Sequence, residues 1–330
     1  MNYRTLGKTG LRVSELGMGC SGIGRTMYHR DDSGARATLL ESLDAGVNFY
    51  DTAPGYSAGE SERLIGEAFK GKRDQVIITS KAGVVGTPVG RFAKRYKHLL
   101  RPINYLFKPV QSLLPRLYQS QKRVNFSRAW IVGSLEKSLK RMKTDYLDIL
   151  LLHHPTPDSL TQPMFCDTFL DLQKAGKILH WGISPDTLEQ AMLCLDVPNI
   201  EVIQLDVSLF SDNLMDSFLK RAKDKNIGIV ARKVLEQGLL TGTNGQSKAD
   251  RWATDREWLN TTKDRIQRLE FLETRERTMA QAALLYIRAL EQVATAAVGY
   301  STLEHFREDI RAYSLPLLSV DELKRVRALQ

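Results

Sequence analysis

Short apolar runs rich in β-branched residues alternate along the chain with longer segments whose apolar positions recur at helical spacing. Three of the helical segments are preceded by Ser127, Asp186 and Asp212, which are predicted N-caps because a side-chain oxygen there accepts free backbone N–H groups. The eight predicted strands span 14–19, 47–51, 75–81, 147–153, 178–184, 201–206, 227–231 and 294–299. The predicted helices span 32–45, 60–69, 127–142, 157–175, 186–195, 212–225, an interrupted 265–290, 302–312 and a last one at 320–329.

Eight strands that are each followed by a helix predict an α/β fold, a parallel sheet closed into a (β/α)8 TIM barrel with its active site at the C-terminal ends of the strands. The main alternative is an open doubly wound sheet, which usually carries a Gly-x-Gly-x-x-Gly turn after its first strand. Residues 17–22 have that spacing, but no long helix follows at once and no acidic residue closes a second strand. We therefore expect one barrel domain over 1–330, with a β-hairpin at 3–14 that covers the N-terminal end of the barrel.

Two connections are too long for plain loops between a strand and the next helix. They follow the third and seventh strands, at 86–126 and 241–262. Both leave the barrel on its catalytic side, and loops of this length in a compact domain are usually functional.

Composition narrows the class of protein. The chain has 330 residues, 42% hydrophobic and 26% charged, which is typical of a globular protein. No apolar run approaches the roughly 20 residues of a membrane span, and the first residues lack the apolar stretch of a secretory signal, so the expected location is the cytoplasm. The three cysteines are widely separated and have no Cys-x-x-Cys spacing, which indicates packed thiols and neither a disulfide framework nor a metal site; they are Cys20, Cys166 and Cys194.

The net charge of +9 belongs to one segment. Between 86 and 126 there are nine Lys or Arg residues and no Asp or Glu, and the other 38 basic residues equal the 38 acidic ones. Nucleic acid is therefore a poor fit as a partner, since the body of the protein offers no supporting basic face.

Polar and titratable residues stand where the predicted strands end. Asp51, Lys81 and His153 end the second, third and fourth strands, and Tyr56 follows Asp51 by five residues. On a barrel these positions converge over the mouth.

Together the four residues make a proton donor. Tyrosine has a pKa near ~10, but an ammonium about 4 Å away favours the phenolate by roughly 4 kcal/mol at an effective dielectric near 20. Lys81 can supply that charge, Asp51 can keep the lysine protonated by pairing with it, and His153 can hold a carbonyl oxygen beside Tyr56. The chemistry implied is protonation of an oxygen while hydride arrives at carbon.

These residues lie in longer motifs, which are 46–56 with Gly59-Glu60-Ser61-Glu62 and Leu64-Ile65-Gly66, Thr79-Ser80-Lys81, 145–153, 176–178, 182–184 and 238–242. Together the motifs resemble the aldo-keto reductase superfamily over nearly the whole chain. By this resemblance Tyr56 is the general acid, Lys81 and Asp51 tune it, and His153 orients the substrate carbonyl. The resemblance also implies a nicotinamide dinucleotide cofactor that lies extended across the barrel mouth, without a Rossmann fold.

The resemblance also implies cofactor contacts. Ser184 and Gln204 hydrogen-bond the carboxamide, Arg232 stacks on the nicotinamide ring, and the loop with Leu235, Gln237, Gly238 and Leu240 follows the pyrophosphate. Residues 299–302 lead into a helix whose free N–H groups can hold the adenosine end. Further residues expected along the cofactor are Gly19, Cys20, Gly299, Ser301, His305, Glu308 and Asp309.

The chain departs from the family pattern at three of these positions. Pro185 stands where an Asn often follows the serine, and His305 stands where Arg or Gln is usual. NADP(H) is expected ahead of NAD(H), but no Arg or Lys lies between Gly299 and Phe306, so the preference stays open, with Arg307 as a candidate phosphate contact. His154 replaces a common aromatic residue and is a candidate substrate contact.

The basic segment 86–126 mixes Lys and Arg with Leu, Phe and Tyr, and prolines divide it. It fits a lid for an anionic substrate, a protein contact or a membrane-surface contact. The sequence as a whole predicts an NAD(P)H-dependent oxidoreductase that reduces an aldehyde or ketone, or oxidises the matching alcohol or hemiacetal. The alternatives are an NAD-linked sugar dehydrogenase and a non-catalytic protein that senses redox state through the cofactor; substrate and oligomeric state are not predicted.

Overall fold

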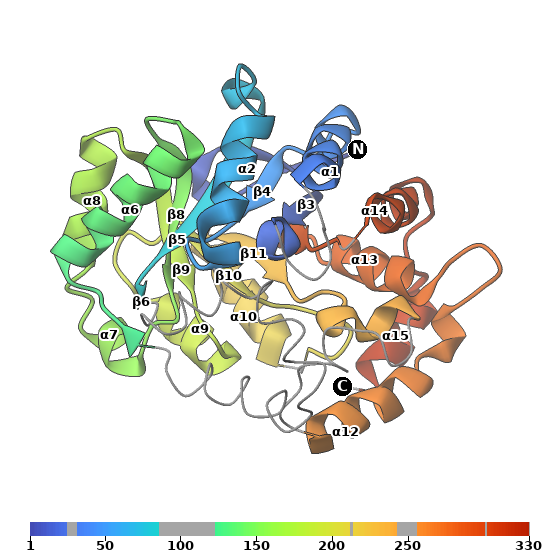
Figure 1. The fold of residues 1–330 in the computed structure, drawn as a ribbon. Coiled ribbons are helices and arrows are strands. Elements are labelled where there is room, and N and C mark those ends of the chain that lie inside the picture. The colour runs from blue at the N-terminus through green and yellow to red at the C-terminus, as the bar shows by residue number, and fades with distance from the viewer. Residues whose placement is uncertain (25–31, 86–122, 212–213, 243–255, 301, 330) are drawn as a thin grey trace, which may run out of the picture.

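Eight parallel strands hydrogen-bond side by side into a closed ring, with the helices outside it (Figure 1). The computed structural model describes residues 1–24, 32–85, 123–211, 214–242, 256–300 and 302–329. The predicted (β/α)8 barrel is confirmed, and its strands follow one another around the ring in chain order. They are β3 (Leu16–Gly19), β4 (Phe49–Asp51), β5 (Ile77–Ala82), β8 (Leu147–His153), β9 (Ile178–Ser184), β10 (Val202–Asp206), β11 (Gly228–Arg232) and β12 (Val293–Val298).

The helices follow the strands as the hydrophobic spacing predicts, and they shield the ring from solvent (Figure 1). Ser127 caps its helix as expected, because its side chain accepts the N–H of Trp130. The helices are α1 (Asp32–Asp44), α2 (Glu60–Ala68), α6 (Arg128–Met142), α7 (Pro157–Thr161), α8 (Cys166–Lys174), α9 (Leu188–Cys194), α10 (Leu214–Asp224), α12 (Arg256–Gln267), α13 (Met279–Ala289), α14 (Leu303–Ile310) and α15 (Val320–Arg327).

Three predictions about the helices were wrong. The single helix at 157–175 is two helices, α7 and α8, since Pro163 lacks the N–H that would continue the first. The N-cap of α9 is Thr187, whose side chain accepts the N–H of Gln190, so the predicted cap Asp186 does not cap this helix. The connection predicted at 241–262 contains the first residues of α12, which begins at Arg256. The third predicted cap, Asp212, lies outside the described residues.

The N-terminal hairpin pairs β1 (Tyr3–Thr5) with β2 (Arg12–Ser14) and closes the lower end of the barrel, as predicted. Leu6 and Val13 are fully buried in one cluster with Val202 and Val230 from inside the ring. The turn approaches so closely that a Cβ on Gly7 would lie 2.2 Å from the Gly228 backbone nitrogen. The hairpin therefore occupies the end of the barrel opposite the predicted active site.

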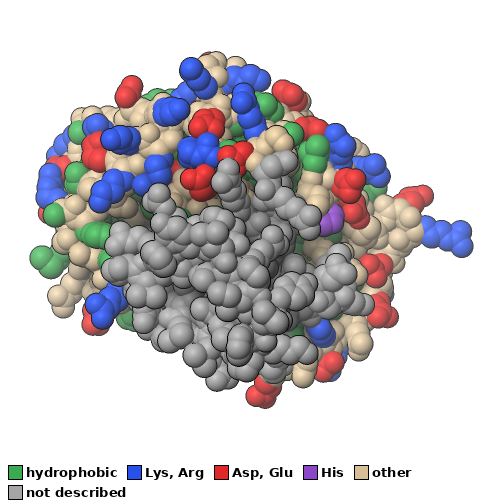
Figure 2. Space-filling view, viewed as in Figure 1, with side chains coloured by type: hydrophobic (Ala, Val, Ile, Leu, Met, Phe, Trp, Pro, Cys, Tyr) green, Lys and Arg blue, Asp and Glu red, His purple; other side chains and the backbone are tan. Residues whose placement is uncertain are grey.

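The long connection after β5 begins and ends as a two-stranded antiparallel ribbon, β6 (Val84–Val85) with β7 (Arg123–Val124). Residues 86–122, which hold most of the basic segment, lie outside the described residues. Over the described part of the face in Figure 2, basic and acidic side chains are interspersed, in line with the balanced charge of the rest of the chain. Within the described ranges, no helix has the length and apolar character needed to cross a membrane.

Candidate active site

Asp51 and Lys81 form a buried ion pair at the upper ends of β4 and β5. The Lys81 ammonium donates to Asp51 Oδ1 at 2.5 Å, to the Thr52 carbonyl at 2.9 Å and to the Tyr56 hydroxyl at 3.4 Å. Lys81 is 2% exposed and Asp51 is 5% exposed, so little solvent screens the pair. The structure therefore brings three of the four predicted catalytic side chains into direct contact.

Burial and charge act on these groups in opposite directions. Burial raises the pKa of the Tyr56 phenol above its ordinary value, and the charge and hydrogen bond of Lys81 oppose that rise. Burial lowers the pKa of Lys81, but the Asp51 carboxylate and Tyr56 together more than offset this, so the pKa of Lys81 is raised and the ammonium stays charged. Lys81 is thus a fixed positive charge beside a hydroxyl that keeps its proton.

The chain around Tyr56 is set by an unusual turn. Ser57, Ala58 and Gly59 follow it with φ of 50°, 60° and 94°, three left-handed residues in succession. Ser57 anchors the turn by donating its hydroxyl to the Ile23 carbonyl at 3.0 Å.

Side chains of α2 hold the strand ends that carry the ion pair. Ser61 bonds to the Thr52 hydroxyl at 2.8 Å, and Glu62, which is fully buried, accepts from Ser80 at 2.8 Å and from Arg141 Nε at 2.6 Å. Since Thr52 and Ser80 neighbour Asp51 and Lys81 in the chain, this network fixes the spacing of the pair. Apart from Ser61 and Glu62, which belong to a motif, these contacts could not be predicted from the sequence, because they join segments far apart in the chain.

A second polar chain leads from the ion pair to the neighbouring strands. Gln204 Nε2 donates to Asp51 Oδ1 at 2.8 Å, and Ser184 Oγ donates to Gln204 Oε1 at 3.2 Å. Arg232 Nη1 donates to Ser184 Oγ at 3.0 Å, which extends the chain across β9, β10 and β11. The predicted carboxamide contacts are therefore bonded to each other and to the predicted proton donor system.

Arg232 is fixed from both sides. It donates to the Pro185 carbonyl at 2.7 Å, and its Nε donates to Asp206 Oδ1 at 2.6 Å. The other oxygen of Asp206 accepts from Lys233 at 2.5 Å. Asp206, which the sequence analysis did not single out, thus orients the guanidinium predicted to stack on the cofactor.

His153 ends β8 beside the ion pair's strand, and its ring stacks on His154 with centroids 4.0 Å apart and 24° between the planes. His154 has a left-handed backbone, with φ of 56°, and its Nδ1 is hydrogen-bonded to Asp186 Oδ1. The predicted substrate contact therefore already has two protein partners.

The loop after β11, which is predicted to follow the pyrophosphate, has a left-handed backbone. Glu236, Gln237 and Gly238 have φ of 46°, 55° and 93°. The amides of Glu236 and Gly238 donate within the loop, to the carbonyls of Lys233 and Leu235, at 2.8 Å each. The side chains of Leu235 and Leu240 are buried in the core, so they do not reach the surface of the loop.

The adenosine end of the predicted site is formed by close contact of two glycines. A Cβ on Gly19 would lie 3.3 Å from the Gly299 backbone nitrogen, so the two backbones approach closely here. Thr302 caps α14 by accepting the His305 N–H at 3.2 Å, which uses one of the amides predicted to be free. His305 itself is exposed, and Ser301 lies outside the described residues.

Four other residues predicted near the cofactor make contacts within the protein. Asp309 faces the core and is 5% exposed, and burial raises its pKa to about 7. The backbone carbonyl of its neighbour Glu308 is bonded to Gln281. Arg307 pairs with Glu41 of α1 at 2.5 and 2.8 Å, so it does not turn toward a phosphate. The Cys20 side chain is fully buried, and its thiol donates to the Met18 carbonyl at 3.5 Å.

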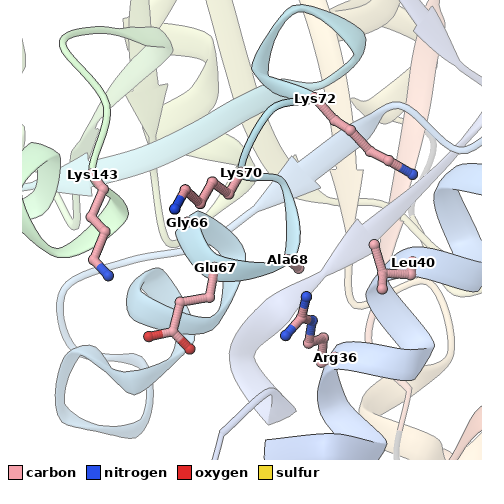
Figure 3. A pocket seen from close by; sticks show the side chains of 8 residues that line it. All are labelled: Arg36, Leu40, Gly66, Glu67, Ala68, Lys70, Lys72 and Lys143. Atoms are coloured by element: carbon pink, nitrogen blue, oxygen red, sulfur yellow. The ribbon is translucent and has the colours of Figure 1, made fainter.

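A hollow of about 530 Å³ lies away from these residues, between α1, the C-terminal end of α2 and the turn after α6 (Figure 3). Because α2 runs from β4 down to the start of β5, this hollow is toward the end of the barrel opposite the mouth. None of the predicted catalytic or cofactor residues borders it; its lining is Arg36, Leu40, Gly66, Glu67, Ala68, Lys70, Lys72 and Lys143.

The donor set suits a nicotinamide cofactor. Beyond the bonds described, Gln204 keeps one amide hydrogen and one oxygen lone pair, which a carboxamide can use. The arrangement can hold a flat polar group beside the Tyr56 hydroxyl and donate a proton there.

Comparison with known proteins identifies a matching family model and similar chains. The model described as "Aldo/keto reductase family" matches residues 15–330. The aldo-keto reductase YhdN of Bacillus subtilis is 34% identical over 245 residues, 73% of this chain and 64% of that protein. The NADH-specific methylglyoxal reductase of Escherichia coli is 26% identical over 329 residues, 96% of this chain and 94% of that protein. Among solved structures, the holo form of the aldo-keto reductase AKR11C1 from Bacillus halodurans is 26% identical with a TM-score of 0.77, and the match covers 100% of this chain and 96% of that one.

Proposed function

The chain belongs to the aldo/keto reductase family, and from that premise we propose that Tyr56 is the proton donor of an NAD(P)H-dependent carbonyl reduction. The observation that carries the proposal is the position of Lys81, whose ammonium contacts both Asp51 and the Tyr56 hydroxyl in a nearly dry setting. The protein is an oxidoreductase that uses a nicotinamide cofactor, as its family does.

The residues act in turn on the carbonyl oxygen. Bound nicotinamide supplies hydride to the carbonyl carbon. As negative charge develops on the oxygen, the Tyr56 hydroxyl transfers its proton to it, and the Lys81 ammonium at 3.4 Å stabilises the phenolate that remains. Asp51 keeps Lys81 protonated throughout, and His153 donates a hydrogen bond that holds the carbonyl oxygen beside Tyr56. In the oxidative direction Tyr56 takes the proton back from an alcohol.

Ser184, Gln204 and Arg232 are the proposed contacts to the nicotinamide end. Their mutual hydrogen bonds and the link to Asp51 mean that the cofactor and the proton donor are aligned by one network. The loop at 235–240 is the proposed pyrophosphate contact.

The adenosine end favours a cofactor without a 2′-phosphate. Arg307 is paired with Glu41, and the first turn of α14 carries Glu304 and no Lys or Arg. A 2′-phosphate adds about two negative charges and needs cations there. We therefore propose that NADH is accepted at least as well as NADPH, against the sequence-based preference for NADP(H).

The proposed substrate is a small aldehyde or ketone. Among the residues that the structure describes, Tyr56 and His153 are proposed to face it, and each carries an aromatic ring with a polar group. The role of the basic segment 86–126, whether lid, protein contact or membrane contact, remains a prediction from its composition.

Replacement of Tyr56 by Phe tests the proposal. Turnover of a panel of small aldehydes with NADH and NADPH should fall by at least about 100-fold, because the general acid is gone, while the dissociation constant for either cofactor changes less than about twofold. Tyr146→Phe is the matched control, since Tyr146 lies at the opposite end of β8 and contacts Arg73. Turnover by Tyr56→Phe equal to that of the control would reject Tyr56 as the acid.

A further inference from the structure

The two histidines at the end of β8 are held in an arrangement that neighbouring residues rarely adopt. Successive side chains of a strand point to opposite faces, so adjacent rings do not normally stack. Here His153 and His154 stack at 4.0 Å because the His154 backbone turns into the left-handed region, with φ of 56°. A non-glycine residue in that region is strained and persists only where its surroundings fix it.

Contacts with the end of β9 and the residues after it hold His154 in this conformation. The His154 backbone N–H donates to the Ser184 carbonyl at 3.2 Å, and His154 Nδ1 is hydrogen-bonded to the carboxylate of Asp186. Asp186 is itself placed by its backbone N–H, which donates to the Gln190 side chain at 2.9 Å. The His154 ring is therefore clamped between the Asp186 carboxylate at its edge and the His153 ring on its face.

We propose that Asp186 and His154 form a positioning pair that fixes the ring of His153 for the carbonyl substrate. Asp186 fixes the orientation of His154, and His154 restricts the rotation of His153 by covering one face of its ring. His153 then keeps its hydrogen-bonding edge directed at the oxygen that Tyr56 protonates, which lowers the entropy lost when substrate binds. The inference rests on the proposed function, since it assigns His153 to the substrate carbonyl.

This role differs from the substrate contact predicted for His154 from the sequence. A ring whose Nδ1 is bonded to Asp186 and whose face is covered by His153 has little freedom to follow a substrate. Its side chain is only 16% exposed, while the carboxylate of Asp186 is 43% exposed at the rim. The pair thus acts through His153.

A double-mutant cycle in kcat tests the pair. Asp186→Ala and His154→Ala are each expected to lower kcat about 10-fold, and the double variant is expected to lose no more than either single one, because the two act as a unit. Asp186→Asn keeps an acceptor for the Nδ1–H and should recover most of the loss. Cofactor affinity should stay within about twofold in all of these variants.

Gln190→Ala is the matched control for the loop. It removes the contact to the Asp186 backbone but leaves both members of the pair, so kcat should fall less than twofold. An equal loss in Gln190→Ala and Asp186→Ala, or full additivity of the two alanine variants, would overturn the proposal in favour of a purely structural loop contact.

A spectroscopic readout separates this inference from the proposed function. In protein labelled with ¹⁵N-histidine, the six His rings can be resolved and His153 assigned by His153→Gln. Asp186→Ala should shift the ring signals of His153 without any substrate present, and Asp186→Asn should shift them less. Unchanged His153 signals would reject the pair whatever the enzyme's activity, whereas shifted signals together with Tyr56-independent turnover would reject only the proposed function.

Discussion

Asp51 and Lys81, 30 residues apart in the chain, are joined by a 2.5 Å ion pair between adjacent barrel strands. The same Asp51 oxygen accepts from Gln204 at 2.8 Å, so one buried atom connects the proposed proton donor with the proposed cofactor contacts. Replacing Lys81 therefore removes the positive charge beside Tyr56. It also leaves Gln204 as the remaining donor of the two side chains that bond to this Asp51 oxygen.

Replacement of Lys81 by Met should shift the pH dependence of alcohol oxidation. Lys81 opposes the rise in the pKa of Tyr56 that burial causes, so its removal raises that pKa further. Oxidation needs the Tyr56 phenolate as a base, so the rise of kcat with pH on the acid side of the profile should move to higher pH by at least about one unit, while kcat at pH 7 falls 100-fold or more. The pH profile of kcat with a panel alcohol measures this.

A second variant separates the charge effect from loss of folding. Lys81→Met alone leaves the Asp51 carboxylate buried beside an apolar chain, which destabilises the protein. Lys81→Met with Asp51→Asn removes both charges and should recover stability in thermal unfolding but not activity. If activity returned with stability, the ammonium would have no role in catalysis.

The pair between Arg307 and Glu41 predicts how cofactor preference can be changed. Glu41→Gln releases Arg307 from a two-point ion pair, and the freed guanidinium can reach a 2′-phosphate as a charge-assisted donor. The dissociation constant for NADPH should fall about 3–10-fold while that for NADH stays within twofold, as measured by Trp fluorescence quenching. Arg307→Gln in the native background should have little effect on either, because Arg307 is already occupied; an unchanged NADPH to NADH ratio in Glu41→Gln would contradict the prediction.

The barrel could be predicted because each strand and helix has its own local pattern. Strands β8 and β9 begin and end as the apolar runs indicate, and the polar residues that end them face the mouth for geometric reasons that hold in any such barrel. The break between α7 and α8 was missed, although Pro163 marked it, since the apolar spacing continues across the proline.

The partners of the site residues could not be predicted in the same way. The sequence around Asp186 fits an N-cap of α9 as well as a partner of His154, because Thr187 beside it can also cap the helix. The structure has Thr187 as the cap and Asp186 hydrogen-bonded to His154. Likewise the pairing of Arg307 with Glu41 joins positions 266 residues apart, and only the packing of α14 against α1 creates it. Contacts of this kind depend on tertiary structure, which spacing does not encode.

The buried Asp309 predicts a loss of stability as pH rises. Burial raises its pKa to about 7, so between the ordinary carboxyl pKa and 7 the folded state holds a proton that the unfolded state has lost. The contribution of Asp309 to the free energy of unfolding is therefore complete at low pH. It decreases as pH rises through 7, by about 2–3 kcal/mol between pH 5 and 8. Asp309→Asn cannot ionise, so the difference in unfolding free energy between variant and wild type should grow in the variant's favour over that range.

Urea unfolding at pH 5, 6, 7 and 8 measures this difference, and the groups near Asp309 set the control. Glu308 is the charged neighbour of Asp309 in the chain, and its charge also raises the pKa of Asp309. The charge of Asp309 in turn raises the pKa of the buried hydroxyls of Tyr300 and Tyr313. Glu308→Gln should leave the pH dependence nearly as in wild type. A constant difference between Asp309→Asn and wild type at all four pH values would show that Asp309 is ionised in the folded protein.

Lys143 ends α6 with a left-handed backbone, at φ 55° and ψ 46°, and its N–H donates to the Leu139 carbonyl. A Cβ in this conformation crowds the following carbonyl, whereas glycine is the residue that helices commonly place there. Lys143 also belongs to the four cations around the hollow of Figure 3, so replacing it changes both backbone strain and charge.

Comparing two neutral variants of Lys143 separates these effects. Both variants lose the charge, but only Lys143→Gly also loses the Cβ. Lys143→Gly should therefore be more stable than Lys143→Ala by about 1 kcal/mol in urea unfolding. Equal stability of the two variants would mean that α6 does not end in the left-handed turn. The end of α6 also packs closely on α2, where a Cβ on Gly66 would come within 2.2 Å of the Met142 carbonyl oxygen, so this contact would then have to be different as well.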